Sequence, residues 1–145
     1  VLLRSTLDAD VAMGCAVAAL AATGNGKILS VILADAPVHA KSAMTAASIM
    51  AQNNVWYPYV EMADDPALKG LPAQLRMNAI ISHGGTTKSN FEAFSLAASI
   101  VGKCHFCVKA HYDTLKNSEG YTVEQLRDIG RIASVMNSVA KVLNS

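Results

Sequence analysis

The chain has few aromatic residues, only three cysteines and almost no net charge. The formal charge is +1, from 12 basic and 11 acidic residues, and no basic run stands out. Because a nucleic-acid-binding surface needs concentrated positive charge, this balance argues against nucleic acid as a partner. Three cysteines with no leader pattern ahead of them fit reduced cytosolic thiols better than a disulfide framework, so we expect a cytoplasmic protein.

Long apolar runs are also absent. The most apolar segment, residues 11–22, is too short to cross a bilayer, and no signal-peptide pattern precedes it. We therefore expect no association with a membrane.

Good helix formers dominate the composition, chiefly Ala, Leu and Met, together with Val and Ile. Apolar residues recur at helical spacing, and no strand run, linker, repeat or low-complexity tract interrupts them. We therefore predict an all-α protein in which residues 1–145 form a single compact helical domain. The predicted helices cover residues 8–23, 27–35, 37–52, 73–81, 88–101, 104–116 and 122–143, with a helical turn at 53–58 and loops at 64–72.

Local signals place the ends of these helices. Gly at the end of a helix and Ser, Thr or Asn at its start satisfy backbone groups that have no partner inside the helix. A Thr at the cap with Gln three residues later forms a capping box. The residues that carry these signals are Ser5 or Thr6, Gly24, Thr86 or Thr87, Gly102, and the pair Thr122 and Gln125.

The segment with the most chemistry is residues 102–115, GKCHFCVKAHYDTL. Cys104 and Cys107 are three residues apart in the first turn of a predicted helix, close enough to form a disulfide. Unbonded N–H groups at the helix start favour thiolate over thiol. His111 follows Cys107 by four residues on the same face, whereas Cys104 is two turns away, roughly 10 Å along the axis. A histidine so placed can exchange protons with a thiol near neutral pH.

Glu92 is the predicted partner of His111. If helix 88–101 folds back on helix 104–116 around Gly102 and Lys103, residues whose numbers sum to about 205 face each other. Glu92 then lies within a turn of His111. A carboxylate in the apolar run 91–101 needs such a partner, because burying it alone is costly. Glu92, His111, Cys107 and Cys104 thus form a candidate proton path that ends in a dithiol.

Zinc is the alternative use of the same residues. Cys104, Cys107 and His111 could bind it with a fourth ligand from His39, His83 or Glu92. Structural zinc sites usually draw their ligand pairs from separate turns, whereas three of these ligands would share one helix. We predict no metal, and a zinc-stabilised or redox-sensing interaction module remains the non-enzymatic alternative. Cys15, in an Ala-rich helix, is expected to be a buried core residue.

The chain resembles the alkyl hydroperoxidase D family, a helical branch of the carboxymuconolactone decarboxylase-like group. The resemblance covers nearly the whole sequence. Its most specific part is Glu92, then eleven residues, then Cys104-x-x-Cys107-x-x-x-His111. It also rests on residues 49–50 with 53–57, on 75–78 and on 90–92.

The resemblance implies an all-helical homotrimer with weak alkyl hydroperoxide reductase activity and no bound cofactor. It implies electron transfer from dihydrolipoamide, carried by a lipoylated 2-oxoacid dehydrogenase acyltransferase and recharged by lipoamide dehydrogenase, to a peroxiredoxin of the alkyl hydroperoxide reductase C type. Cys107 matches the sulfenic acid-forming cysteine, and Cys104 matches the proton donor and mixed-disulfide partner. Glu92 and His111 match the proton relay. A decarboxylase-like enzyme acting on a lactone acid is the alternative within the group.

One position departs from the family pattern. A well-known member of the family has a histidine directly before its second cysteine, where this chain has Phe106. The histidine here is His105, one place earlier, so no role is assigned to a histidine between the cysteines.

Overall fold

Helices make up the regular structure of the chain in the computed structural model, which describes residues 4–75 and 85–143. Within these two ranges no strand is present, and the predicted all-α class is confirmed. None of the described helices is both long and apolar enough to span a membrane. The helices are α1 (Ala9–Thr23), α2 (Gly26–Leu33), α3 (Ala40–Ala63), α4 (Pro66–Lys69), α6 (Lys88–Gly102), α7 (His105–Asn117) and α8 (Val123–Val142).

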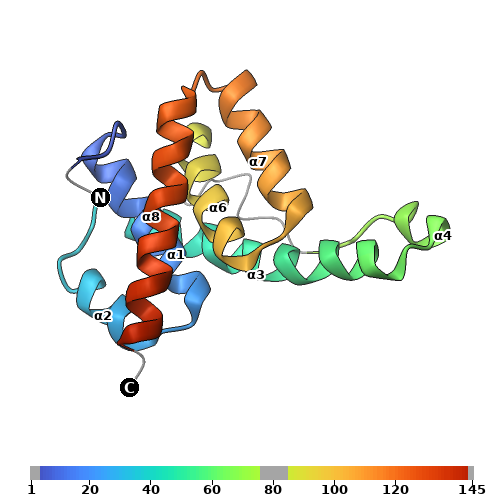
Figure 1. Ribbon diagram of the computed structural model, residues 1–145, viewed down its shortest axis with the longest axis horizontal. Helices are drawn as coiled ribbons and strands as arrows, with labels where there is room; N and C mark the ends of the chain where they lie inside the picture. Colours follow the sequence, from blue (N-terminus) through green and yellow to red (C-terminus); the bar gives the residue numbers. More distant parts are fainter. Residues whose placement is uncertain (1–3, 76–84, 144–145) are drawn as a thin grey trace.

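The centre of the fold is α1, which packs against α3, α6 and α8 (Figure 1). A helix buried on most sides must be apolar around most of its circumference, and nine of its residues are indeed buried. One of them is Cys15, as predicted for a small core residue. Small residues let α1 approach α6 closely: the Phe94 ring fills the space that a side chain at Gly14 would need.

Most predicted helix ends are confirmed. Gly24 ends α1 in a left-handed conformation with φ of 79°. Thr87, rather than Thr86, caps α6 by accepting a hydrogen bond from the Asn90 N–H, and the Thr122–Gln125 capping box opens α8. The predicted helix at 73–81 falls mainly on residues 76–84, which lie outside the described residues; residues 73–75 have no regular structure.

Two helix ends were predicted wrongly. Asp8, and not Ser5 or Thr6, caps α1, because its carboxylate accepts a hydrogen bond from the Asp10 N–H at 2.9 Å. Pro37 does not open α3. It begins a turn in which its carbonyl accepts from the Ala40 N–H, and the helix starts there.

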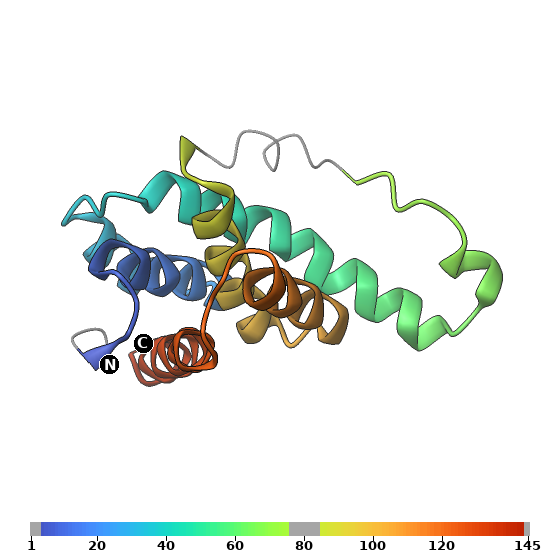
Figure 2. The same ribbon diagram turned by 90° about the horizontal axis from the view of Figure 1, so that it is seen from above.

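The length of α3 was also predicted wrongly. The helix continues through residues 53–58, where we expected only a turn, and the middle segment contains the short α4. Pro58 lies inside α3 and offers no N–H, so it removes only the backbone bond to the carbonyl of Asn54. The last turns of α3, and α4 after them, project beyond the other helices (Figures 1 and 2).

Asp128 ties the start of the chain to α8. Its side chain is 1 % exposed, and one oxygen accepts from the Thr6 hydroxyl at 2.6 Å and the Thr6 N–H at 2.7 Å. The other oxygen accepts from Arg127 and Arg131, each at 3.1 Å. The hydrogen bonds from Thr6, and then those from the arginines, hold the pKa of this carboxyl well below its ordinary value of 3.8.

We expect Asp128→Asn to lower the free energy of unfolding at pH 7 by about 2 kcal/mol, because the charged acceptor of four hydrogen bonds is lost. A pKa lowered by folding stabilises the protein above the ordinary value of that group. This stabilisation should be complete above about pH 5 and should decline as pH falls through the usual aspartate range. Denaturant titrations at a fixed protein concentration, at pH 7 and pH 3, measure both effects.

The matched control is Asp64→Asn, since Asp64 pairs with Lys69 at 2.8 Å on the exposed surface. Exposed ion pairs contribute little to stability, so this variant should unfold like the wild type. Equal behaviour of the two variants would show that the Thr6–Asp128 contact does not stabilise the fold.

Candidate redox site

The dithiol lies at the junction between α6 and α7. Lys103 follows α6 and adopts a left-handed conformation with φ of 56°. The turn thus lies at the predicted Gly102–Lys103 position, but Lys103, and not Gly102, is the residue that ends the helix. Cys104 is the N-cap of α7, and its Sγ accepts a hydrogen bond from the Cys107 N–H at 3.2 Å. An N–H of the first helical turn thus donates to the Cys104 sulfur instead of to a backbone carbonyl.

Cys104 and Cys107 are joined as a disulfide, with their Cα atoms 5.3 Å apart. Both are buried, at 0 % and 3 % exposure. Cys15 is free and also buried; its thiol donates to the Ala93 carbonyl at 3.7 Å, and burial raises its pKa to about 12. A thiol that stays protonated at neutral pH does not compete in thiol exchange, so the reactive sulfur chemistry is confined to the first turn of α7.

The predicted contact between Glu92 and His111 is confirmed. Glu92 on α6 places one carboxylate oxygen 2.6 Å from the Nδ1 of His111 on α7. The two side chains are 18 % and 17 % exposed, so this contact is partly shielded from water. A carboxylate at Nδ1 fixes the orientation of the ring.

The second ring nitrogen of His111 contacts a methionine. Its Nε2 lies 3.2 Å from the Sδ of Met50, which is on α3 and only 1 % exposed. Among the described residues, no hydrogen bond joins His111 to either cysteine sulfur. The structure therefore brings together Glu92 with His111 and Cys104 with Cys107, and the two pairs are not directly hydrogen-bonded in the disulfide form.

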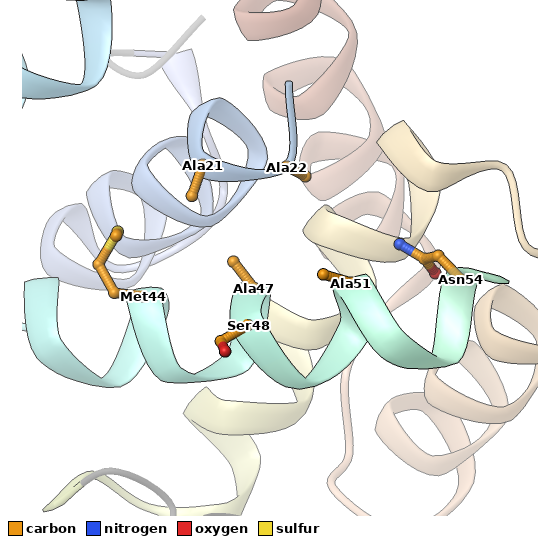
Figure 3. A pocket seen from close by; sticks show the side chains of 7 residues that line it. All are labelled: Ala21, Ala22, Met44, Ala47, Ser48, Ala51 and Asn54. Atoms are coloured by element: carbon orange, nitrogen blue, oxygen red, sulfur yellow. The ribbon is translucent and has the colours of Figure 1, made fainter. Parts of the chain in front are cut away.

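Two asparagines of α3 support the junction from the other side. The Asn53 carbonyl lies 3.8 Å from the Cys104 Sγ and can accept the S–H of the reduced cysteine. The Asn54 amide donates to the Ala98 carbonyl at 3.4 Å and packs on Gly102. Beyond it, Asn54 borders a hollow of about 250 Å³ between α1 and α3 whose walls are mostly alanine (Figure 3).

A methyl group at position 102 would overlap the side chain of Asn54, and even Asn54 Cβ would lie 2.9 Å away. We expect Gly102→Ala to lower the free energy of unfolding by about 1–3 kcal/mol, because α3 must move away from the junction. Gly130→Ala in α8 is the control, since nothing lies within 4 Å of a Cβ there. That variant should gain about 0.5–1 kcal/mol from the lower entropy of its unfolded state.

Denaturant unfolding of both variants measures these opposite signs. If Gly102→Ala matched Gly130→Ala, the close approach of Asn54 to the junction would be unimportant for stability.

The surface around the dithiol is apolar with positive charges. Phe106, 57 % exposed, stacks on Tyr57 of α3 with ring centroids 4.4 Å apart. A surface hollow of about 390 Å³ lies beside the disulfide, and Cys104 is the cysteine that lines it. The other lining residues are Lys103, His105, Val108, Lys109 and Tyr112.

The residues named for the zinc alternative are not gathered in the described part of the chain. No group of three or more His, Cys, Asp or Glu side chains there is arranged to hold a metal ion. His39 packs its ring against Phe94, with centroids 5.7 Å apart, and His83 lies outside the described residues.

Met50 and Asn53 are the site residues that sequence reasoning did not assign. They are three residues apart, so they share one face of α3 if that helix continues past residue 52. Because we predicted a separate turn at residues 53–58, the sequence did not indicate that Met50 and Asn53 share a face.

Fold and site together define an all-helical protein with a CxxC dithiol at the start of a helix and a Glu–His pair beneath it. The model of the Carboxymuconolactone decarboxylase family matches residues 66–145. Among curated proteins, the chain is 39 % identical to alkyl hydroperoxide reductase AhpD of Rhodospirillum centenum, covering 100 % of this chain and 80 % of that protein. It is 38 % identical to AhpD of Anaeromyxobacter dehalogenans (90 % and 72 % covered) and 37 % identical to AhpD of Coxiella burnetii (89 % and 75 %). The chain therefore belongs to the alkyl hydroperoxide reductase AhpD family, within the carboxymuconolactone decarboxylase family.

Proposed function

We propose that this protein is an antioxidant dithiol oxidoreductase with weak alkyl hydroperoxide reductase activity. Its dithiol passes electrons from dihydrolipoamide to a peroxiredoxin of the alkyl hydroperoxide reductase C type. The observation that carries this proposal is the Cys104–Cys107 disulfide at the start of α7, with His111 on the same helix held by Glu92 of α6. The names of the AhpD relatives support a peroxide-related reaction.

The oxidative half-reaction uses Cys107. Its thiolate attacks one peroxide oxygen, the O–O bond breaks, and the alkoxide leaves as the alcohol after taking a proton. The sulfenic acid on Cys107 is then attacked by Cys104, which forms the disulfide and releases water. Two electrons pass from the dithiol to the peroxide, and Cys104 supplies a proton as its thiol is consumed.

The reductive half-reaction uses Cys104. A thiolate of dihydrolipoamide attacks the Cys104 sulfur, and Cys107 leaves as a thiolate that takes a proton from His111. The second lipoyl thiol then closes the lipoyl disulfide and releases Cys104. The hollow that Cys104 lines, with Lys103 and His105 in its wall, supports an approach of the reductant from the Cys104 side of the disulfide.

Reduction of the oxidised protein by different dithiols tests the proposal. Free dihydrolipoamide and a dihydrolipoyl domain should reduce the disulfide much faster than thioredoxin does. The reduced protein should then transfer its electrons to a peroxiredoxin of the stated type. Faster reduction by thioredoxin would assign the dithiol to a different electron donor.

We also propose that the working form is a homotrimer. The C-terminal half of α3 carries the exposed apolar side chains of Val55, Tyr59 and Met62, at 71 %, 51 % and 78 % exposure, which a second copy of the chain could cover. The number three comes from the family resemblance alone. Sedimentation that gives a monomer at all concentrations would contradict this proposal.

A further inference from the structure

Both nitrogens of the His111 ring are occupied, and the partner of Nε2 has no proton to give. Nδ1 faces the Glu92 carboxylate at 2.6 Å, and Nε2 faces the Met50 Sδ at 3.2 Å. A thioether sulfur can only accept a hydrogen bond. The contact with Met50 is therefore a hydrogen bond only when Nε2 carries the proton.

We propose that Met50 is a positioning residue that keeps His111 protonated at Nε2 while the disulfide is closed. The inference rests on the proposed function, in which His111 supplies a proton to the leaving Cys107. Met50 is 1 % exposed, so water does not compete for Nε2 from that side. The Asn53 amide lies 4.0 Å from the same sulfur and belongs to the same turn of α3, which holds Met50 against the ring.

This arrangement stores the proton required by the first step of reduction. The incoming thiolate forms a bond to the Cys104 sulfur, the Cys104–Cys107 bond breaks, and Cys107 leaves with the electron pair. The Nε2 proton passes to that thiolate, directly or through water, as His111 turns from Met50. When the second reductant thiol releases Cys104, its proton goes to the Cys104 thiolate, and the proton lost when the first reductant thiol ionised returns to His111 through water. Two electrons and two protons have then moved from the reductant to the protein.

Nitrogen NMR on the oxidised protein tests the proposal without any catalytic assay. The ¹⁵N shifts of the His111 ring, assigned by their loss in His111→Phe, should show Nε2 in its protonated form at pH 7. Met50→Leu keeps an apolar side chain of similar volume and removes the acceptor, so the Nε2 signal should move towards the unprotonated form. Met50→Gln offers an oxygen acceptor and should restore it.

The rate of disulfide reduction by dithiothreitol provides the second readout. Met50→Leu should slow it by about three- to tenfold, the effect expected of losing one hydrogen bond to a charged group through a weak acceptor. Met136→Leu is the control, because Met136 lies on α8, packs against the hydrophobic core and is not one of the residues described at the redox site. Its NMR signals and rate should equal those of the wild type.

Two results would overturn the proposal. One is an unprotonated Nε2 in the wild-type oxidised protein. The other is a Met50→Leu variant whose Nε2 signal and reduction rate stay at the wild-type values; should that variant not fold, it is a Met50→Gln variant in which Nε2 is unprotonated. Neither readout uses dihydrolipoamide or peroxide, so a failure of the proposed function would not produce either result.

Discussion

Replacing Cys104 or Cys107 by serine is expected to reduce dihydrolipoamide-linked peroxide turnover by at least about 10³-fold. Each cysteine is needed for the disulfide that links the two half-reactions. A serine hydroxyl cannot form this disulfide, and it cannot act as the leaving group when the bond is reduced. Removing a catalytic nucleophile commonly lowers the reaction rate by this factor or more. Coupled turnover, followed through NADH consumption by lipoamide dehydrogenase, is the measurement.

The two variants should differ in what peroxide leaves behind. In Cys104→Ser, the sulfenic acid on Cys107 has no partner and should accumulate, where dimedone and mass spectrometry can detect it. In Cys107→Ser, no sulfenic acid should form at this site. The reverse pattern would exchange the proposed roles of Cys104 and Cys107.

Cys15→Ala is the control for both cysteine variants, since Cys15 is buried in α1 and forms no disulfide. Its turnover should match the wild type. Full activity on a lactone acid by a variant lacking both Cys104 and Cys107 would instead favour a decarboxylase-like enzyme.

Glu92→Gln and His111→Phe should each slow turnover by about 10²–10⁴-fold, the usual contribution of a positioned acid–base group. Their 2.6 Å contact makes them one device: without Glu92 the ring loses its orienting carboxylate, and without His111 the carboxylate has nothing to orient. The double variant should therefore be little slower than the slower single variant. Turnover is measured as for the cysteines, and thiolate formation is followed by ultraviolet absorbance across pH.

Asp113→Asn removes a carboxylate from the same helix and serves as the control. Asp113 pairs with Lys109 on the exposed surface, so its loss should leave turnover unchanged. The disulfide should still form in every variant, as shown by peptide mapping. Near-wild-type rates and thiolate titrations for Glu92→Gln and His111→Phe would mean that both residues are only structural.

Local signals were sufficient for the parts of the site that lie on neighbouring helices. The Glu92–His111 contact follows from two consecutive helices folding back around a short turn, because the residue numbers then fix the register. The Thr122–Gln125 box lies within a single turn and is equally readable.

Contacts across long sequence separations could not be predicted in this way. Met50 meets His111 from 61 residues away, and Thr6 meets Asp128 from 122 residues away. Both contacts depend on which helices pack against each other, and the periodicity of apolar residues does not indicate this. The left-handed conformation of Lys103 was not predicted for a different reason: the adjacent Gly102 is the residue type that ordinarily adopts a positive φ.

The disulfide bridges residues only three apart, within the first turn of α7. It joins no two helices, and the loop that it closes is so short that it restrains almost none of the unfolded chain. Opening or closing it therefore leaves the packing of the helices and the stability of the fold nearly unchanged. The molecule can cycle between its oxidised and reduced forms with no refolding step to limit the rate. A partner can therefore distinguish the oxidised from the reduced form only by contacting the start of α7. This fits the proposed electron carrier and not a protein that signals by changing its conformation.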